Sequence, residues 1–248
     1  MVSFQLLNAV RYIPVHIGLH KRKHLFIHIP KNGGMSIRRA PQLEGRLLTA
    51  TRKRLISTQY AKEVSAIIKK GGTHHARLID IDRSVRRASI PFAVVRNPWS
   101  RVFSRFTFGL QGDQGGSEVR DISAADFERF VDERHEYGDK PYFWHKAIRG
   151  WYPQADYVLD EKGDVGADVL RFEKLQEDFQ TYFKAEEPLR PRNRTKRKKV
   201  CYKNFYSDKL IQDVADWYSR DIELFGFDFE GGARKNTFAA RMTGGGNQ

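Results

Sequence analysis

The 248-residue sequence contains a single cysteine, Cys201, so it can form neither an intrachain disulfide nor a thiolate-rich metal site. A chain without disulfides suits a reducing compartment, and we expect a cytoplasmic protein. Long apolar runs are also missing. The longest fairly apolar stretch, residues 4–19, is interrupted by Arg11 and Pro14 and is too short to span a bilayer. These absences predict a protein with no transmembrane segment and no bound metal.

Acidic residues are outnumbered, since 44 lysines and arginines face 30 aspartates and glutamates and leave a net charge of +14. A surplus of this size attracts polyanions such as nucleic acids, acidic lipids, sulfated sugars and nucleotide cofactors, and charge alone does not choose among them. The sequence shows no helix-turn-helix, zinc-finger or RNA-recognition signature, and its positive charge is spread along the chain. We therefore expect no specific nucleic-acid partner.

Buried-strand patterns alternate with helical patterns along the chain, which is typical of an α/β domain built on a parallel sheet. Strands are predicted at residues 24–29, 91–95, 155–160 and 169–172, and helices at 57–70, from 98 onward, and at 123–133, 174–183 and 208–225. The length and a hydrophobic content of 40% fit one domain over residues 1–230. Residues 231–248 are glycine-rich and predict a flexible tail.

The most informative stretch is LFIHIPKNGGMSIRR at residues 25–39, where a buried strand is followed by a lysine, two glycines and a serine. Adjacent glycines let the backbone turn tightly, and the N-terminus of the following helix favours an anion. A Walker A loop is excluded, because its lysine follows the glycines. The pattern predicts a phosphate-binding loop made of Lys31, Asn32, Gly33, Gly34, Met35 and Ser36. The alternative is a plain strand–turn–helix connection with an exposed lysine.

A second candidate anion site follows the predicted strand at 91–95, in the segment AVVRNPWSRVFSRF. Arg96 stands at the carboxyl end of that strand, the edge at which open parallel sheets bind ligands. Ser104 lies eight residues later, and a guanidinium with a hydroxyl suits a terminal phosphate. The alternative is that Arg96 pairs with a surface carboxylate and Ser104 merely packs. Two anion sites together fit a cofactor with phosphates at both ends.

These two segments resemble the sulfotransferase superfamily, and most closely its branch of carbohydrate sulfotransferases and their bacterial relatives. IPKNGGMS at residues 29–36 is similar to the family pattern IPKTGGTS, and VRNPWSRVFS at residues 95–104 is similar to VRNPxxRxxS. Residues 156–178 and 204–229 are similar to later family segments, including FEKL and the closing FGFDF. Asn32 and Met35 depart from the family's frequent threonines. Asn32 can still donate a side-chain hydrogen bond, whereas Met35 cannot.

The resemblance implies a P-loop-like three-layer α/β fold with a central, mostly parallel sheet flanked by helices. It implies 3′-phosphoadenosine 5′-phosphosulfate (PAPS) as sulfuryl donor, with the loop of residues 31–36 on the 5′-phosphosulfate and Lys31 near the bridging oxygen. Arg96 and Ser104 would hold the 3′-phosphate. Asn193 and Arg194, within the basic run RPRNRTKRKK, stand where the family has residues near the cofactor. The implied partner is a hydroxyl-bearing acceptor, a glycan or small molecule, and the chemistry requires no metal.

Transfer to a hydroxyl needs a group that takes its proton, and histidine suits this role because its pKa lies near neutrality. The family branch often has a histidine in a segment like KHATAR, and GTHHAR at residues 72–77 offers His74 and His75. Successive residues of an extended segment face opposite ways, so we expect only one of them in the cleft and favour His75. A solvated histidine pair is the alternative. Rival functions are a P-loop-type kinase and a non-catalytic homologue that binds nucleotides or polyanions.

Overall fold

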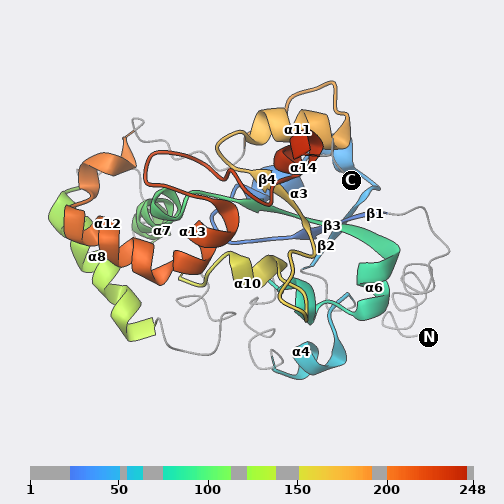
Figure 1. Cartoon of the computed structure of the whole chain (residues 1–248), viewed down its shortest axis with the longest axis horizontal. Coiled ribbons are helices and arrows are strands. Elements are labelled where there is room, and N and C mark those ends of the chain that lie inside the picture. Colours follow the sequence, from blue (N-terminus) through green and yellow to red (C-terminus); the bar gives the residue numbers. More distant parts are fainter. Residues whose placement is uncertain are drawn as a thin grey trace.

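The computed structural model describes residues 23–50, 55–63, 75–112, 122–137, 151–191 and 200–244. At the centre of this part of the chain is a parallel sheet of β1 (Lys23–Ile27), β2 (Leu47–Thr49), β3 (Ser89–Val95) and β4 (Asp168–Arg171), in the order β2-β1-β3-β4 (Figure 1). The register of β1 and β3 places Phe26 beside Phe92. The predicted α/β class with a parallel central sheet is confirmed.

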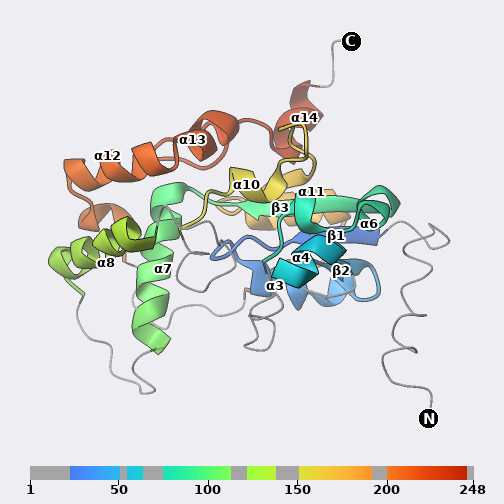
Figure 2. The same ribbon diagram turned by 90° about the horizontal axis from the view of Figure 1, so that it is seen from below.

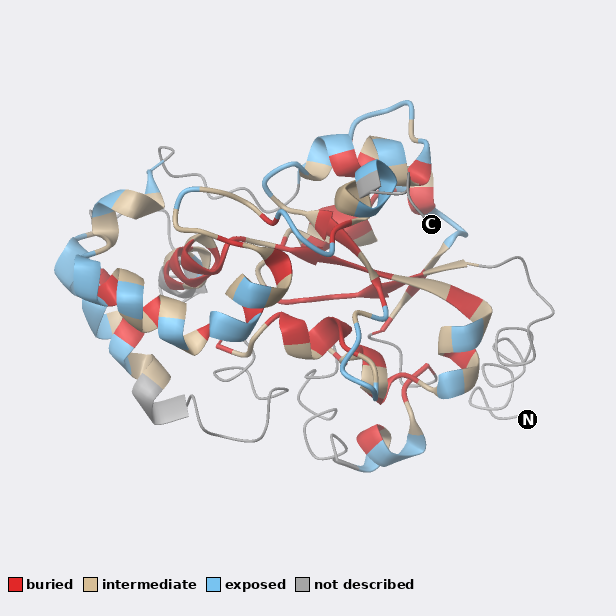
Figure 3. Cartoon of the chain, in the orientation of Figure 1, coloured by how far each residue is buried: buried red, intermediate tan, exposed pale blue. Residues whose placement is uncertain are grey.

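Both faces of the sheet are buried, which is why its strands are short, almost continuous apolar runs (Figure 3). One face is covered by α3 (Gly34–Arg38) and α11 (Leu175–Phe183), and its core contains Phe26, Phe92, Val94, Leu170, Ile37, Phe179 and Phe183. The other face is covered by α4 (Thr58–Glu63), α6 (Arg83–Ala88) and α10 (Ala155–Val158), and its core contains Leu25, Ile27, Ala93, Val95, Val169, Tyr60, Val85 and Tyr157. The alternation of neighbouring residues between the two cores follows from the period of two in a strand.

A group of helices lies beyond the carboxyl ends of β1 and β3 (Figure 1). It consists of α7 (Pro98–Gly112), α8 (Ala124–Tyr137), α12 (Asp208–Trp217) and α13 (Ser219–Phe225), together with the short η3 (Tyr202–Phe205). Figure 2 shows α7 running away from the sheet. The rings of Phe103 and Phe106 on α7 lie 5.5 and 5.3 Å from that of Phe127 on α8, measured between centroids. This aromatic packing holds α7 against α8.

Two predicted elements are wrong. Residues 155–160, predicted as a strand, contain the helix α10, because Asp221 accepts hydrogen bonds from the backbone N–H groups of Gln154 (2.9 Å) and Ala155 (2.7 Å) at its first turn. The single helix predicted at 208–225 is divided at Tyr218 into α12 and α13. Tyr218 is buried, and its hydroxyl donates to the carbonyl of Trp151 at 2.9 Å, a distant partner that helical periodicity does not report.

The chain beyond residue 231, predicted as a flexible tail, contains the helix α14 (Phe238–Gly244). The ring of Phe238 packs edge-on against Tyr182, with centroids 4.8 Å apart. Arg241 pairs with Asp168 at 3.1 Å and donates to the carbonyl of Ala167 at 3.0 Å. These contacts dock α14 against β4 at the edge of the sheet. In the described ranges, no helix has both the length and the apolar character needed to cross a membrane.

Candidate active site

The predicted phosphate loop lies between the carboxyl end of β1 and the first turn of α3. Lys31 and Gly33 both have left-handed backbone conformations, with φ of 70° and 75°, and Gly34 then begins the helix. A left-handed residue followed by a helical one gives the backbone arrangement of anion-binding nests. A Cβ on Gly33 would also lie 3.1 Å from the ring of Phe172. The loop therefore turns directly from β1 into α3, and its use as a phosphate site stays a prediction.

Gly34 is required for a different reason, the closeness of a histidine ring. A Cβ at this position would lie 2.0 Å from Nε2 of His28. His28 is buried and stacks on Phe26 with ring centroids 5.3 Å apart, so its ring is packed in place. The first turn of α3 can approach the end of β1 this closely only with glycine at residue 34.

The side chain of Asn32 points into the protein. It is 1% exposed, and its Nδ2 donates to the carbonyl of Val94 and to Oε1 of Gln154, both at 2.7 Å. Both amide hydrogens are thereby used, so the expectation that this side chain donates to a cofactor is corrected. Of its donors, Asn32 has only the backbone N–H left for a ligand, and its side chain fastens the loop to the end of β3.

Arg96 brings the second predicted segment into contact with the first. Its Nη1 donates to the backbone carbonyl of Lys31 at 3.1 Å, and its Nε and Nη2 donate to Oγ of Ser100 at 2.9 and 2.7 Å. The guanidinium carbon lies 4.2 Å from the ring centroid of Phe172. Within the described ranges, Arg96 thus hydrogen-bonds to a hydroxyl and a carbonyl and not to the surface carboxylate of the alternative interpretation.

The cations at this edge raise one another's electrostatic energy. Burial, with the neighbouring Arg96 and Arg105, lowers the pKa of Lys31 to about 7. Burial also lowers the pKa of Arg96 to about 10; the nearby carboxylate of Glu173 acts against this shift, and Arg101 acts in the same direction as burial. The Nζ of Lys31 lies 3.7 Å from the ring centroid of Phe108, a contact that partly replaces lost water. A bound anion would relieve this accumulation of positive charge.

The remaining predicted residues of the two segments differ in their burial and contacts. Ser104 is partly buried on α7, one helical turn after Ser100 and hence on the same face. Ser36 is buried in α3, and its backbone N–H bonds to the carbonyl of Gly33 at 2.9 Å. The sulfur of Met35 lies 4.0 Å from Nη1 of Arg38, so this side chain lies beside the helix surface. Ser100 was missed by the sequence reasoning, although its i,i+4 spacing from Arg96 is a usable signal.

His75 lies against the end of β1, next to the loop. Its Nδ1 is 2.7 Å from the carbonyl oxygen of His28, and the two rings have centroids 4.6 Å apart. A carbonyl only accepts hydrogen bonds, so Nδ1 carries the proton and Nε2 of the neutral ring carries the lone pair. This tautomer is the one that a general base needs. His74, Asn193 and Arg194 lie outside the described residues.

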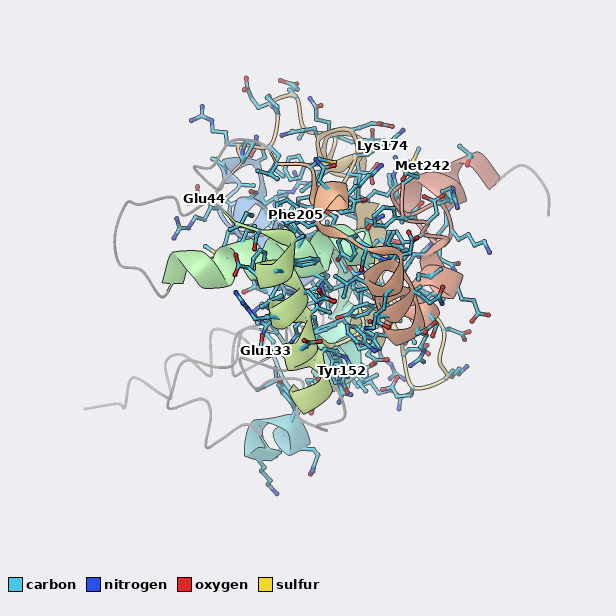
Figure 4. All side chains as sticks on the ribbon, turned by 90° about the vertical axis from the view of Figure 1, so that its left-hand side faces the viewer. Glu44, Glu133, Tyr152, Lys174, Phe205 and Met242 are labelled. Atoms are coloured by element: carbon cyan, nitrogen blue, oxygen red, sulfur yellow. The ribbon has the colours of Figure 1, made fainter. Side chains whose placement is uncertain are left out.

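Three buried residues that hold the site together were missed by the sequence reasoning: Arg101, Gln154 and Asp221. Arg101 is 1% exposed, and it donates to the carbonyl of Pro30 at 3.1 Å and to that of Tyr152 at 2.8 Å. Gln154 and Asp221 join the loop, β3 and α13. Figure 4 views the molecule from this end, with Phe205 on η3 and Glu133 on α8 labelled. The only local signal was the second arginine of the VRNPxxR segment.

A parallel α/β sheet with a glycine loop and buried cations at its carboxyl edge is consistent with a P-loop-like fold. The family model described as "Sulfotransferase family" matches residues 19–228, most of the chain. The protein therefore belongs to the sulfotransferase family and is a transferase. The match names the family and no branch within it. No curated protein and no solved structure matches the chain.

The contact between Gly34 and His28 yields a test of the loop geometry. In an ordinary helix, Gly→Ala stabilises by about 1 kcal/mol. Here Gly34→Ala places a methyl group against the ring of His28, so we expect it to lower the free energy of unfolding by about 1–3 kcal/mol. Chemical denaturation of Gly34→Ala, His28→Ala and the double variant measures the coupling. The double variant should lose less stability than the sum of the two single variants, and strict additivity would contradict the contact.

Proposed function

We propose that the protein transfers a sulfuryl group from PAPS to a hydroxyl of an acceptor, with a carbohydrate as the acceptor class. The observation that carries this proposal is the 3.1 Å hydrogen bond from Arg96 to the carbonyl of Lys31, which joins two separate cationic segments at one edge of the sheet. A donor with phosphate groups at both ends needs two such sites. The family match supports the sulfuryl transfer, and the carbohydrate acceptor rests on the sequence resemblance.

In this proposal each segment holds one end of the donor. The backbone N–H groups of residues 32–35, the hydroxyl of Ser36 and the side chain of Lys31 take the 5′-phosphosulfate, and Arg96 with Ser104 takes the 3′-phosphate. Asn193 and Arg194 are proposed near the nucleotide. PAPS supplies the sulfuryl group, which moves to the acceptor oxygen by in-line displacement and leaves 3′-phosphoadenosine 5′-phosphate behind. The donor set of the site is made of N–H groups, hydroxyls and cations, and these suit phosphate oxygens.

Different side chains accept the proton of the acceptor hydroxyl and stabilise the charge on the leaving group. Nε2 of His75 accepts the proton of the acceptor hydroxyl, because Nδ1 is committed to the carbonyl of His28. Lys31 stabilises the negative charge that grows on the leaving phosphate oxygen, and a donor aimed at such a charge is worth more in the transition state than in the ground state. Lys31 must be protonated for this task, and the phosphates themselves favour its charged form.

The test of the function compares ligands before it looks for turnover. We expect calorimetry to show that 3′-phosphoadenosine 5′-phosphate binds much more tightly than ATP with magnesium, because the two cationic segments match the two phosphate positions. Incubation with sulfur-labelled PAPS and a panel of glycans and small hydroxyl compounds should then give a labelled product. Tighter binding of ATP with magnesium would favour the kinase. Nucleotide binding without transfer to any acceptor would favour a non-catalytic homologue.

Lys31→Ala should lower kcat by about 100-fold or more, the usual effect of removing one preorganised donor, while affinity for the product nucleotide falls much less. Steady-state kinetics and product binding measure the two effects. Lys31→Arg keeps the charge on a bulkier planar group, so it should restore binding better than turnover. A variant with normal kcat and a raised KM would show that Lys31 only aids donor binding and does not serve the transition state.

Binding should also be coupled to a proton. Since the pKa of Lys31 is lowered to about 7, most of the free protein carries a neutral lysine at pH 8. A bound phosphate raises this pKa, so the complex takes up as much as one proton at pH 8 and progressively less as the pH falls below 7. Calorimetry of 3′-phosphoadenosine 5′-phosphate binding in buffers of different ionisation enthalpy counts this proton. Lys31→Met is the control and should remove the uptake; uptake that persists in Lys31→Met would assign it to another group.

A further inference from the structure

One glutamine side chain bonds to both candidate anion-binding segments. Gln154 is fully buried and lies between the loop and the end of β3. Its Oε1 accepts hydrogen bonds from Nδ2 of Asn32 at 2.7 Å and from the backbone N–H of Arg96 at 2.9 Å. Its Nε2 donates to the backbone carbonyl of Arg96 at 2.8 Å. The residue after Lys31 and both backbone polar groups of Arg96 are therefore held by the same amide.

Gln154 is in turn held by a buried carboxylate on α13. Oδ2 of Asp221 accepts from the backbone N–H of Gln154 at 2.9 Å and from its Nε2 at 3.2 Å. The amide has two hydrogens and two acceptor positions, and all four are used. A flipped amide would point Nε2 at the two donors of Asn32 and Arg96, so the hydrogen bonds fix its orientation. Gln154 is thus a rigid link, and its position is set from outside the two segments.

The other links between the two segments do not position Arg96 independently of the ligand-binding side chains. Arg96 reaches the carbonyl of Lys31 through a long side chain, the same group that is proposed to hold a phosphate. Arg101 fastens the carbonyl of Pro30 to α7, with its Nε at 3.1 Å, and so acts on the loop from the helix. Asn32 also bonds to the carbonyl of Val94 on β3, but not to Arg96 itself. Gln154 joins the side chain of Asn32 to the backbone of Arg96, through a side chain that no ligand can reach because it is 0% exposed. It can set a distance without taking part in binding.

We propose that Gln154 is a positioning residue that fixes the separation of the two anion sites, so that the protein binds a nucleotide with phosphates at both ends far more tightly than either half. This inference rests on the proposed function. Each phosphate site has its own donors and survives the loss of Gln154, but their spacing becomes variable. A ligand that must engage both sites depends on that spacing through the effective concentration of its second group, whereas a ligand with one phosphate does not.

The experiment compares three ligands and three proteins. The ligands are 3′-phosphoadenosine 5′-phosphate, adenosine 5′-phosphate and adenosine 3′-phosphate, with binding measured by calorimetry and, for weak ligands, by competition. Gln154→Met keeps the size of the side chain and removes all four hydrogen bonds. We expect the affinity for the bisphosphate to fall by about 10–100-fold and the affinities for the two half-ligands to fall by less than about threefold.

The matched control is Val214→Ala, which opens a cavity at a fully buried position of α12 outside the network. It should lower Tm and leave the preference for the bisphosphate unchanged. If Gln154→Met is too unstable to purify, Gln154→Asn replaces it, because the shorter uncharged amide keeps a donor and an acceptor but cannot reach both Asn32 and Arg96. We expect a smaller and equally selective loss in that variant.

Two results would overturn the inference. An equal loss for all three ligands, or an unchanged preference for the bisphosphate, in a folded Gln154 variant would show that the residue only stabilises the fold. A selective loss in Val214→Ala would show that any destabilisation produces the effect. Wild-type protein that binds none of the ligands would overturn the proposed function as well, so the failure of the two proposals is told apart by the wild type.

Discussion

A buried amide, that of Gln154, determines how the candidate site is arranged. The carboxyl ends of β1 and β3 leave backbone groups buried beyond the sheet, and such groups cost free energy unless they find partners. Gln154 supplies partners for the N–H and carbonyl of Arg96 and accepts from the side chain of Asn32. The same hydrogen bonds therefore satisfy the buried backbone groups and position the cationic side chains. Asp221 connects this network to α13.

The same edge gathers charge that a folded protein would otherwise avoid. Lys31 and Arg96 are held close to Arg101 and Arg105, and burial lowers the pKa of both Lys31 and Arg96. Such an arrangement weakens the fold in the absence of a ligand, and perturbed pKa values of this kind gather at functional sites. The hydrogen bonds of the buried network hold the cations in place despite their repulsion. Binding of an anion then recovers electrostatic energy that was spent in folding.

Packing around His28 connects the loop with the candidate base. Its ring lies against Gly34 on one side and against the ring of His75 on another, and its carbonyl fixes the tautomer of His75. The sequence indicates His28 only as a packed strand residue, which it is. Its backbone and ring nevertheless contact both the candidate loop and the candidate base. The first turn of α3 and the candidate base are thus both positioned by the same residue at the end of β1.

The sequence by itself determined the local features. Apolar runs predicted β1, β3 and β4, the glycines predicted the turn into α3, and Arg96 was placed at a strand end, because backbone preference and periodicity act within a few residues. Only the tertiary structure decided that Asn32 faces inward, that residues 155–158 are helical and that residues 238–244 dock on β4. The partners of Gln154 in the two segments lie 122 and 58 residues away. Contacts between residues so far apart in sequence form only when the helices pack on the sheet, and local sequence patterns do not predict which helix packs where.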